Sequence, residues 1–380
     1  MKYKRKVFVP DEEVIRRDLE PRVPGEPWPM EVFSNPTPKA CGNPWVGAYS
    51  KHGFWYKFSH CTPDDFQYVV AYSIDTDNWN LQYKDIEIWK EAFGRDCEII
   101  VARGQRNDVM GCIAYAKYGD KLGYIGLYWL MEEYRHSGIG PEMWRYCMKK
   151  LRGRNIGTFG IKYLWEKIRD RHGFKFIQDW QLLKVIVEKP TGLMNLKCDP
   201  GVQIVQATDE KVDSKKLAAY DQRVTGGQVE GRRADYIQNW LQHPEGHSRV
   251  AVTQRGDVCG FGMVREVAGG HVKRLVVGPL YANDERVARA LLYQLLYNYH
   301  DEEERYEWNP NLQAIENREI YFYILSNNEM MKQLAAELKG REGNIFTMDP
   351  LYYKAQFTKE LIRADEGKVF AVSDPYIGPV

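Results

Sequence analysis

The sequence of 380 residues has few of the signals that mark export, membrane insertion or metal binding. Its seven cysteines are scattered, odd in number and never spaced as Cys-x-x-Cys. This argues against a disulfide framework and a zinc cluster and favours a reducing compartment. The basic N-terminus has no long apolar run behind it, so it is not a signal peptide, and no stretch approaches the length that crosses a bilayer. We therefore expect an intracellular, cytoplasmic protein that holds no metal.

An excess of charge of either sign is also missing. The 53 Lys and Arg residues balance 52 Asp and Glu residues, so the formal net charge is +1. Such a balance gives no general reason to expect a nucleic acid or a membrane surface as a partner. Apolar material is plentiful, with 44% hydrophobic and 13% aromatic residues, which is enough for packed cores. The length suggests two or three domains.

Proline is concentrated at the N-terminus, where residues 1–50 hold eight of the 18 prolines. Because proline lacks an N–H and fixes φ, this extension is expected to be extended and irregular. It either wraps the first domain or forms a flexible tail. Its aromatic residues Trp28, Phe33 and Trp45 favour wrapping.

Residues 51–192, which we call the first unit, alternate between strand and helix patterns. Strands are expected at 54–58, 98–103, 109–116, 121–130 and 157–161, with a final pair of strands within 174–187. Helices are expected from Thr62, at 85–93, at 141–151 and at 163–171. The three central strands are separated only by polar turns, so they should form an antiparallel meander. After them, apolar residues recur at spacings of three and four, which predicts one face of a helix.

Residues 200–380, which we call the second unit, repeat this order with little sequence identity. Strands are expected at 202–205, 247–253, 258–264, 271–277 and near 320–325, and helices at 213–220, 233–241, 284–299 and near 329–338. Each half thus contains a strand, two helices, three strands, a helix, a strand and a helix. This predicts two α/β (α+β) units in tandem, each with a mixed, mostly antiparallel sheet flanked by helices.

The segment with the clearest chemistry is residues 127–145, which read LYWLMEEYRHSGIGPEMWR. A strand enters a loop that contains Gly138 and Gly140, and a helix begins at once. Such a loop can direct several backbone N–H groups at one point, where the helix dipole adds a positive field. Glycine has no Cβ to hold a ligand away from the backbone. The pattern predicts a diphosphate-binding loop, to which Arg135 can add a charge-assisted contact.

Other interpretations of this loop remain at this point. A tight turn that binds nothing fits the glycines equally well. A P-loop would need Gly-Lys-Ser/Thr after the glycines, and the sequence has none. A dinucleotide-binding motif would need three glycines in a parallel βαβ unit, whereas this loop follows an antiparallel meander.

The pattern Arg135-x-x-Gly138-x-Gly140 between a strand and a helix resembles the Arg/Gln-x-x-Gly-x-Gly/Ala motif of the GNAT-superfamily N-acetyltransferases. The order of elements in residues 51–190 agrees with this family, and so does the sequence 172–174, His-Gly-Phe. The resemblance implies a GNAT fold that binds acetyl-CoA as a cosubstrate and transfers its acetyl group to an amine, whose identity the sequence does not give.

The second unit resembles the YitH-like GNAT domain, which is found C-terminal to a first GNAT domain. The matching residues are 260–265, Gly-Phe-Gly-Met-Val-Arg, and 277–282, Val-Gly-Pro-Leu-Tyr-Ala. Residues 278–284 lack the Arg-x-x-Gly-x-Gly pattern. We therefore expect that the second unit does not bind CoA in the usual way, and that its pocket serves the acceptor or is purely structural.

The resemblance implies direct attack of the amine on the thioester in a ternary complex, with the thioester carbonyl held by a backbone N–H of the fourth strand. It places Leu130, with Trp129 and Met131, beside the thioester. The implied acetyl-CoA contacts are Trp129, Leu130, Arg135, His136, Ser137, Gly138, Ile139 and Gly140. Pro141 removes one N–H from the start of the helix but is otherwise favourable there.

The catalytic acid and base remain open. The family often has a tyrosine four residues before Gly173, where this sequence has Arg169, which cannot donate a proton near neutral pH but can stabilise a thiolate. Tyr163 lies too early in the helix. Glu132 is the first candidate for the base, although a solvated turn carboxylate fits it as well, and Tyr128 is a further catalytic candidate.

The acceptor side is predicted from position only. Tyr124 should share one face of its strand with Gly126, Tyr128 and Leu130, because side chains alternate along a strand. In the second unit, the expected substrate-binding residues are Asp221, Arg223 and Arg233, for which a salt-bridged surface is the alternative. The missing tyrosine also leaves a second function open, a catalytically inactive GNAT pair that acts as a CoA-binding sensor or a scaffold.

Overall fold

The structure is a computed structural model, and it describes residues 41–161, 164–227, 229, 231–268, 274–304, 318–373 and 375–378. Most of the proline-rich extension lies outside these residues, and so does Tyr163. The predicted wrapping of the extension around the first domain therefore stays a prediction.

The first unit has the predicted strands and helices, with bounds shifted by a few residues. They are β3 (Trp55–His60), α2 (Pro63–Asp77), α3 (Asp85–Phe93), β4 (Cys97–Arg103), β5 (Val109–Tyr118), β6 (Leu122–Leu130), α4 (Ile139–Lys150), β7 (Asn155–Ile161), α5 (Trp165–His172), β8 (Phe176–Ile177) and β9 (Leu182–Glu188). The end of the extension, expected to be irregular, instead forms two short strands, β1 (Cys41–Asn43) and β2 (Gly47–Tyr49), which are not among the predicted strands. The predicted helix start at Thr62 is confirmed, because its hydroxyl accepts the N–H of Asp65 and the Asp65 carboxylate accepts the N–H of Thr62.

The second unit also follows the predicted order. Its elements are β10 (Gln203–Gln206), α6 (Ser214–Val224), α7 (Arg233–Trp240), β11 (Gly246–Val252), β12 (Val258–Val267), β13 (Arg274–Ala282), α8 (Glu285–Glu304), β14 (Glu319–Leu325), α9 (Glu329–Lys339), β15 (Asn344–Phe357) and β16 (Val369–Ala371). Neither β15 nor β16 is among the predicted strands. β15 joins the strands of the two units into one sheet, and β16 fills a gap in the second unit.

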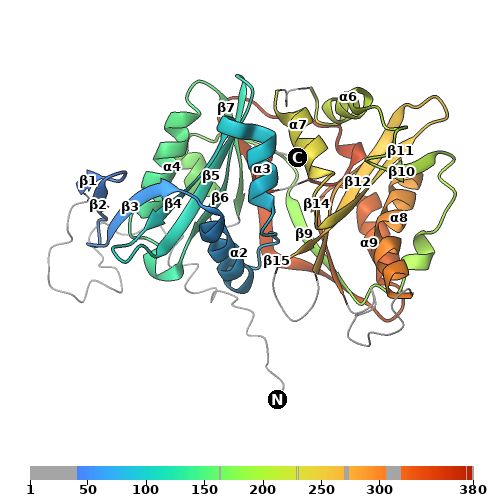
Figure 1. Cartoon of the computed structure of the whole chain (residues 1–380), viewed down its shortest axis with the longest axis horizontal. Helices are drawn as coiled ribbons and strands as arrows, with labels where there is room; N and C mark the ends of the chain where they lie inside the picture. Colours follow the sequence, from blue (N-terminus) through green and yellow to red (C-terminus); the bar gives the residue numbers. More distant parts are fainter. Residues whose placement is uncertain are drawn as a thin grey trace, which may run out of the picture.

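The two halves exchange strands in one hydrogen-bonded sheet. Its order is β1-β2-β3-β4-β5-β6-β7-β15-β9-β14-β13-β12-β11-β10. β15 from the second half lies antiparallel between β7 and β9, and β9 from the first half pairs with β14. Figure 1 shows β9, β14 and β15 at the centre of the molecule, between the two groups of helices. Each half therefore depends on the other to complete its part of the sheet.

Two parallel pairs of strands separate along their length and define the two places where a site is expected. β6 pairs with β7 only from Leu122 to Tyr124, opposite residues 155–157. β13 pairs with β14 only from Arg274 to Val277, opposite residues 319–322. We call the unpaired regions beyond these residues the first gap and the second gap.

A β-bulge in β6 changes which side chains share a face. The pairing with β5 shifts between Cys112 and Ala114, and Leu127 has a φ of 48°. One extra residue inverts the alternation of side chains beyond it. Tyr124 thus lies in the core on the α2 side of the sheet, whereas Tyr128 and Leu130 pack on the α4 side. The prediction that these residues share one face is wrong for this reason.

Helices cover both faces of the sheet in the first unit. α4 contributes Trp144 to the core on one face, and α3 contributes Trp89 to the core on the other. The second of these cores continues into the second unit, where it includes Trp240 of α7. The rings of Phe93 and Tyr236 are 5.6 Å apart across this junction. The α3 face of the first unit is therefore packed against α7 of the second (Figure 1).

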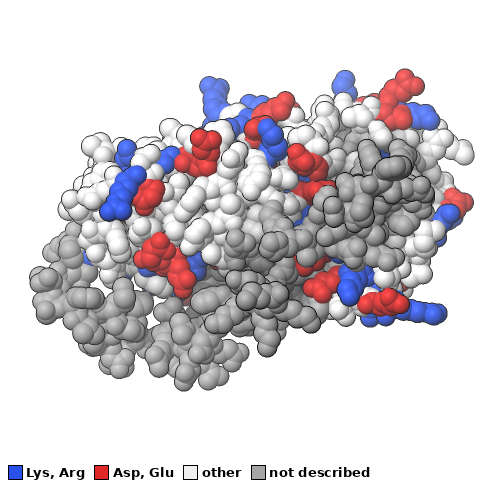
Figure 2. All heavy atoms as spheres, turned by 60° about the horizontal axis from the view of Figure 1, so that its bottom comes forward, with Lys and Arg blue, Asp and Glu red and all other residues white. Residues whose placement is uncertain are grey.

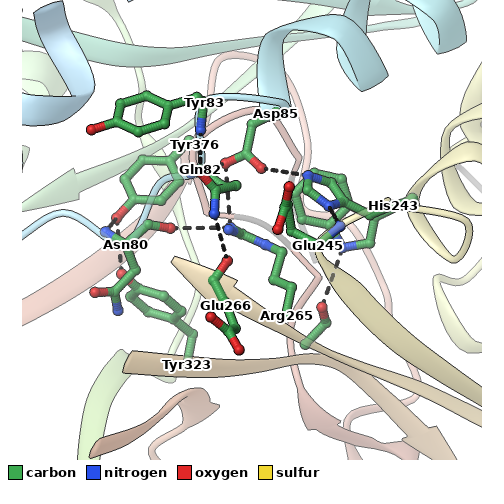
Figure 3. A network of polar contacts seen from close by, with 12 residues as sticks. Asn80, Gln82, Tyr83, Asp85, His243, Glu245, Arg265, Glu266, Tyr323 and Tyr376 are labelled. Atoms are coloured by element: carbon green, nitrogen blue, oxygen red, sulfur yellow. Dashed lines mark hydrogen bonds and ion pairs between the residues drawn. The ribbon is translucent and has the colours of Figure 1, made fainter. Parts of the chain in front are cut away.

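A buried polar network crosses the same junction (Figure 3). His243 donates from Nε2 to the carboxylate of Asp85 at 3.1 Å, because its Nδ1 accepts the N–H of Glu245 at 3.1 Å. Arg265 lies 3.5 Å from the same carboxylate and donates to the carbonyl of Asn80 at 3.0 Å. The network ties the loop between α2 and α3 to β12 of the second unit.

The described surface carries both charges side by side. In the view of Figure 2, Lys and Arg side chains lie among Asp and Glu side chains, and this face shows no large area of one sign. Within the described residues, no helix has the length and apolar character needed to cross a membrane. In the same part of the chain, no three His, Cys, Asp or Glu side chains are placed to hold a metal ion.

Candidate active site

The first gap leads directly to the start of α4. β6 ends at Leu130, a single turn follows at Glu132–Tyr134, and α4 begins at Ile139. The N-cap residue is Gly138, with a φ of 93°, and no side chain caps the helix from this position. Because the first N–H groups of a helix lack partners within it, this helix start is suited to an anionic ligand.

The two glycines of the loop serve different purposes. A Cβ on Gly140 would lie 2.2 Å from the hydroxyl of Tyr128 and 2.8 Å from a methyl group of Leu130. Gly140 is therefore needed for α4 to pack closely on β6. A Cβ on Gly138 would meet only the flexible side chain of Lys51, at 3.4 Å. Gly138 is required by its positive φ and leaves the helix start accessible to a ligand, so the loop fits a diphosphate.

A turn near the described N-terminal end supports this loop, and the sequence analysis does not identify it. The N–H of Lys51 donates to the carbonyl of Ser137 at 3.2 Å. The ring of Phe54 lies edge-on to that of Tyr134, with centroids 5.4 Å apart. Ser137 itself is buried, and its hydroxyl donates to the carbonyl of Tyr134 at 2.6 Å. The backbone of this loop is thus held by the turn that contains Lys51 and Phe54 and by the hydroxyl of Ser137.

Arg135 points away from the helix start. Its Nε donates to the carbonyl of Leu130 at 3.0 Å, and its Nη2 donates to both carboxylate oxygens of Asp77, at 3.1 and 3.2 Å. The guanidinium already has these partners, so the structure leaves the predicted contact between Arg135 and a diphosphate untested. His136 is exposed, with a φ of 65°, and Ile139 is buried under the helix.

The proposed thioester-binding residues lie at the bulged end of β6. The N–H of Met131 donates to the carbonyl of Met110 on β5 at 3.0 Å, so it is not available to a ligand. Trp129 is buried on the α2 side, and its indole N–H donates to Asp77 at 2.8 Å. Leu130 lies between these two residues and is the remaining candidate among the three.

The predicted catalytic residues are spread over β6, the turn that follows it and α5. Tyr128 packs edge-on against Trp144, with centroids 5.4 Å apart, and burial raises its pKa to about 12. It is protonated at neutral pH, as an ordinary tyrosine is, and the raised pKa makes it a weaker acid than an ordinary tyrosine. Glu132 is exposed in the turn after β6. Arg169 lies on α5 and donates to the carboxylate of Asp170 at 2.7 and 3.1 Å, in a pair that is open to solvent.

The predicted acceptor-side residues lie apart from this group. The hydroxyl of Tyr124 is buried and donates to the carbonyl of Pro375, near the C-terminus. Asp221 and Arg233 form a buried ion pair with contacts of 2.9 Å. Asp221 and Arg233 thus form the salt bridge that was the alternative to substrate binding, although the pair lies in the core and not at the surface. Arg223 is exposed, with its guanidinium 5.7 Å from the ring of Tyr220.

The second gap is occupied by the chain itself. β16 pairs with β13 at Leu280 and Tyr281, and the N–H of Val372 donates to the carbonyl of Tyr323 on β14 at 2.9 Å. A Cβ on Gly278 would lie 2.2 Å from the carbonyl oxygen of Val372. Residues 369–372 therefore bridge the two strands, although no pattern in their sequence predicts it.

The helix start next to the second gap also differs from that of α4. The carboxylate of Asp284 accepts the N–H of Val287 at 2.9 Å, as an N-cap residue does at the start of α8. This position corresponds to the glycine-bearing loop of the first unit in the order of elements. The carboxylate of Asp284 thus accepts a helix N–H that a bound anion could accept if the carboxylate were absent.

Comparisons with known proteins agree with this description of the fold. The model of the acetyltransferase (GNAT) family matches residues 63–177, and that of an acetyltransferase (GNAT) domain matches residues 218–347. A curated uncharacterized protein of Caenorhabditis elegans is 23% identical over 100 residues, which cover 26% of this chain and 32% of that protein. The chain thus matches about a third of the length of that relative.

Two solved structures have a similar fold. One is a candidate acetyltransferase from Pyrococcus horikoshii, with a TM-score of 0.59 and 19% identity over 85% of this chain and 96% of that one. The other is a tandem GNAT protein from the clavulanic acid biosynthesis pathway, solved without acetyl-CoA. It has a TM-score of 0.52 and 13% identity over 79% of this chain and 98% of that one. At these identities the likeness concerns the fold alone.

Proposed function

We propose that this chain, which belongs to the GNAT acetyltransferase superfamily in both of its halves, transfers an acetyl group from acetyl-CoA to an amine in its first unit. The amine is a small molecule or a lysine side chain. The observation that carries the proposal is the start of α4, where Gly138 takes the N-cap position without a side chain of its own, and the N–H of Ile139 makes only a long contact, 3.4 Å, with the hydroxyl of Ser137. A diphosphate can accept the N–H groups there and gain from the helix dipole.

The residues of the first gap have definite roles in this proposal. Residues 136–140 hold the diphosphate of acetyl-CoA, which supplies the activated thioester, and the N–H of Leu130 holds the thioester carbonyl. The amine attacks the carbonyl carbon, the carbon–sulfur bond breaks, and the thiolate takes up a proton. Tyr128 is protonated at neutral pH and can supply it, and Glu132 can accept the amine proton through water. Such acid and base groups contribute roughly 10²–10⁴-fold.

Isothermal titration with acetyl-CoA tests this assignment. We expect saturable binding at one site per chain, and the loss of binding in Gly138→Trp, whose indole would cover the helix start. Gly153→Trp is the matched control, because Gly153 has nearly the same φ, 92°, and a Cβ added there would have nothing within 4 Å. Absent binding at millimolar acetyl-CoA, or unchanged binding in Gly138→Trp, contradicts the assignment.

One observation favours the second function, a catalytically inactive GNAT pair that binds CoA as a sensor or serves as a scaffold. Arg169 stands where the family often has a tyrosine, and its guanidinium is paired with Asp170 in an exposed position. Release of free thiol from acetyl-CoA across a panel of amines separates the two functions. Turnover that is lost in Gly138→Trp supports the transferase, whereas tight binding without turnover supports the sensor.

A further inference from the structure

We propose that Asp77 and Arg135 form a clamp that orients the Leu130 amide for acyl transfer. Arg135 then acts as a positioning residue and not as a ligand of the diphosphate. This inference rests on the function proposed above and assigns a role in it to Asp77, at the end of α2. The sequence motif gives no reason to expect that role.

The clamp consists of short contacts between three elements. Arg135 donates to the carbonyl of Leu130 at the end of β6 and to both carboxylate oxygens of Asp77 at the end of α2. The same carboxylate accepts the indole N–H of Trp129 and the hydroxyl of Thr76, both at 2.8 Å. Asp77 therefore fixes the direction of Arg135 and the position of the last residues of β6.

The direction of the Leu130 amide follows from its neighbour on the strand. The N–H of Met131 donates to Met110 on β5. Because N–H and C=O groups of successive residues point alternately to the two sides of a strand, those of Leu130 point away from β5. That side is the first gap. The C=O of Leu130 belongs to the peptide unit after this residue, and the N–H belongs to the peptide unit before it. Arg135 holds the first of these units, and Asp77 restrains Trp129 next to the second, so the clamp limits rotation of the backbone on both sides of the Leu130 N–H.

The reaction is sensitive to this orientation. A hydrogen-bond donor aids transfer only if it is directed at the place where negative charge develops on the carbonyl oxygen. A displacement of about 1 Å can lower a rate by about a hundredfold. In contrast, a guanidinium already paired with a carboxylate has little net charge to attract a second anion. The clamp should therefore act on the rate of transfer more than on the binding of acetyl-CoA.

A double-mutant cycle with Asp77→Ala and Arg135→Ala tests the clamp. We expect each single variant to lower kcat by about tenfold to a hundredfold. The Kd of acetyl-CoA should stay within about threefold of the wild-type value in both. The double variant should have nearly the same kcat as either single variant, because both changes remove the same set of contacts. Asp77→Asn, which keeps its acceptor oxygen, should restore part of the lost kcat.

Arg154→Ala is the matched control. Arg154 donates from Nε to the carbonyl of Gly119 at 2.9 Å, and its Nη2 lies 3.5 Å from the carboxylate of Asp120. This is a similar arrangement at the opposite end of β6. We expect Arg154→Ala to leave kcat and the Kd of acetyl-CoA unchanged.

Hydrogen exchange of the free chain gives a second readout that needs no turnover. The peptide that covers residues 127–131 should exchange faster in Asp77→Ala and in Arg135→Ala than in the wild type. The clamp is overturned if exchange is unchanged in both variants. It is also overturned if Arg135→Ala weakens acetyl-CoA binding while Asp77→Ala changes neither binding nor kcat. If the wild type does not bind acetyl-CoA, the proposed function fails, while exchange still decides on the clamp.

Discussion

The two units share an order of strands and helices but differ where each parallel pair of strands separates. In the first unit, α4 starts at Gly138, and the hydroxyl of Ser137 reaches a helix N–H at a long distance, 3.4 Å. The carbonyl of Tyr376 packs against Gly126 of β6, but none of the described strands pairs with β6 in the first gap. In the second unit, Asp284 caps α8, and β16 pairs with β13 in the second gap. One helix start therefore meets a neutral hydroxyl, and the other already holds a carboxylate.

This difference indicates that the GNAT fold and the proposed acetyl-CoA site are separable. The second unit keeps the strand order while a piece of its own chain takes the position between β13 and β14. Two negative charges about 4 Å apart repel by about 4 kcal/mol near a protein surface. A diphosphate at the start of α8 would meet this repulsion from Asp284. We therefore expect one acetyl-CoA per chain, bound in the first unit.

The largest effect on stability is expected when the buried side chain of β16, the strand that fills the second gap, is removed. Phe370 of β16 is fully buried in the core of the second unit, and Phe370→Ala should lower the free energy of unfolding by about 3–5 kcal/mol. Urea unfolding measures it. Phe176→Ala is the matched control, since Phe176 is 43% exposed in β8, and it should lower the free energy of unfolding by less than about 1 kcal/mol. Similar losses in the two variants would contradict the role of β16 as a filling strand.

A carboxylate placed in the first unit should make it resemble the second. In Gly138→Asp, the new side chain can accept the helix N–H groups and repel a diphosphate, so the Kd of acetyl-CoA should rise by about thirtyfold to a hundredfold. Gly138→Asn is the control, because asparagine has the same shape and the same strain at a φ of 93° but no charge. Isothermal titration that finds equal losses in both would show that strain, and not charge, decides binding.

Local signals in the sequence were sufficient to predict most elements and the glycine loop. The helix at residues 141–151 and the antiparallel meander before it are specified by residues that are close together in the sequence, and both are present. The position of β15 depends on partners far along the chain, such as β7. Its own sequence includes Asp349 and Pro350, which do not suit a regular strand, and its pairing shifts between Thr347 and Tyr352.

The candidate site could be located from the sequence, but its side-chain directions could not. The motif identifies Arg135 by type, whereas its contacts depend on Asp77, which lies on a different element. The bulge at Leu127 follows Gly126, and a glycine inside a strand is a frequent but ambiguous sign of a bulge. The bulge turns Tyr128 and Tyr124 to opposite faces, which the simple alternation of side chains could not predict.

The smallest expected effect tests whether Asp284 or β16 excludes acetyl-CoA from the second unit. Asp284→Ala removes a helix cap, so the free energy of unfolding should fall by about 1 kcal/mol. Asp213→Ala, at the cap of α6 and outside the second gap, should cause a similar fall. Because β16 still bridges β13 and β14, titration of Asp284→Ala should give one acetyl-CoA per chain, as in the wild type. A second binding site in this variant would mean that the carboxylate alone closes the second unit.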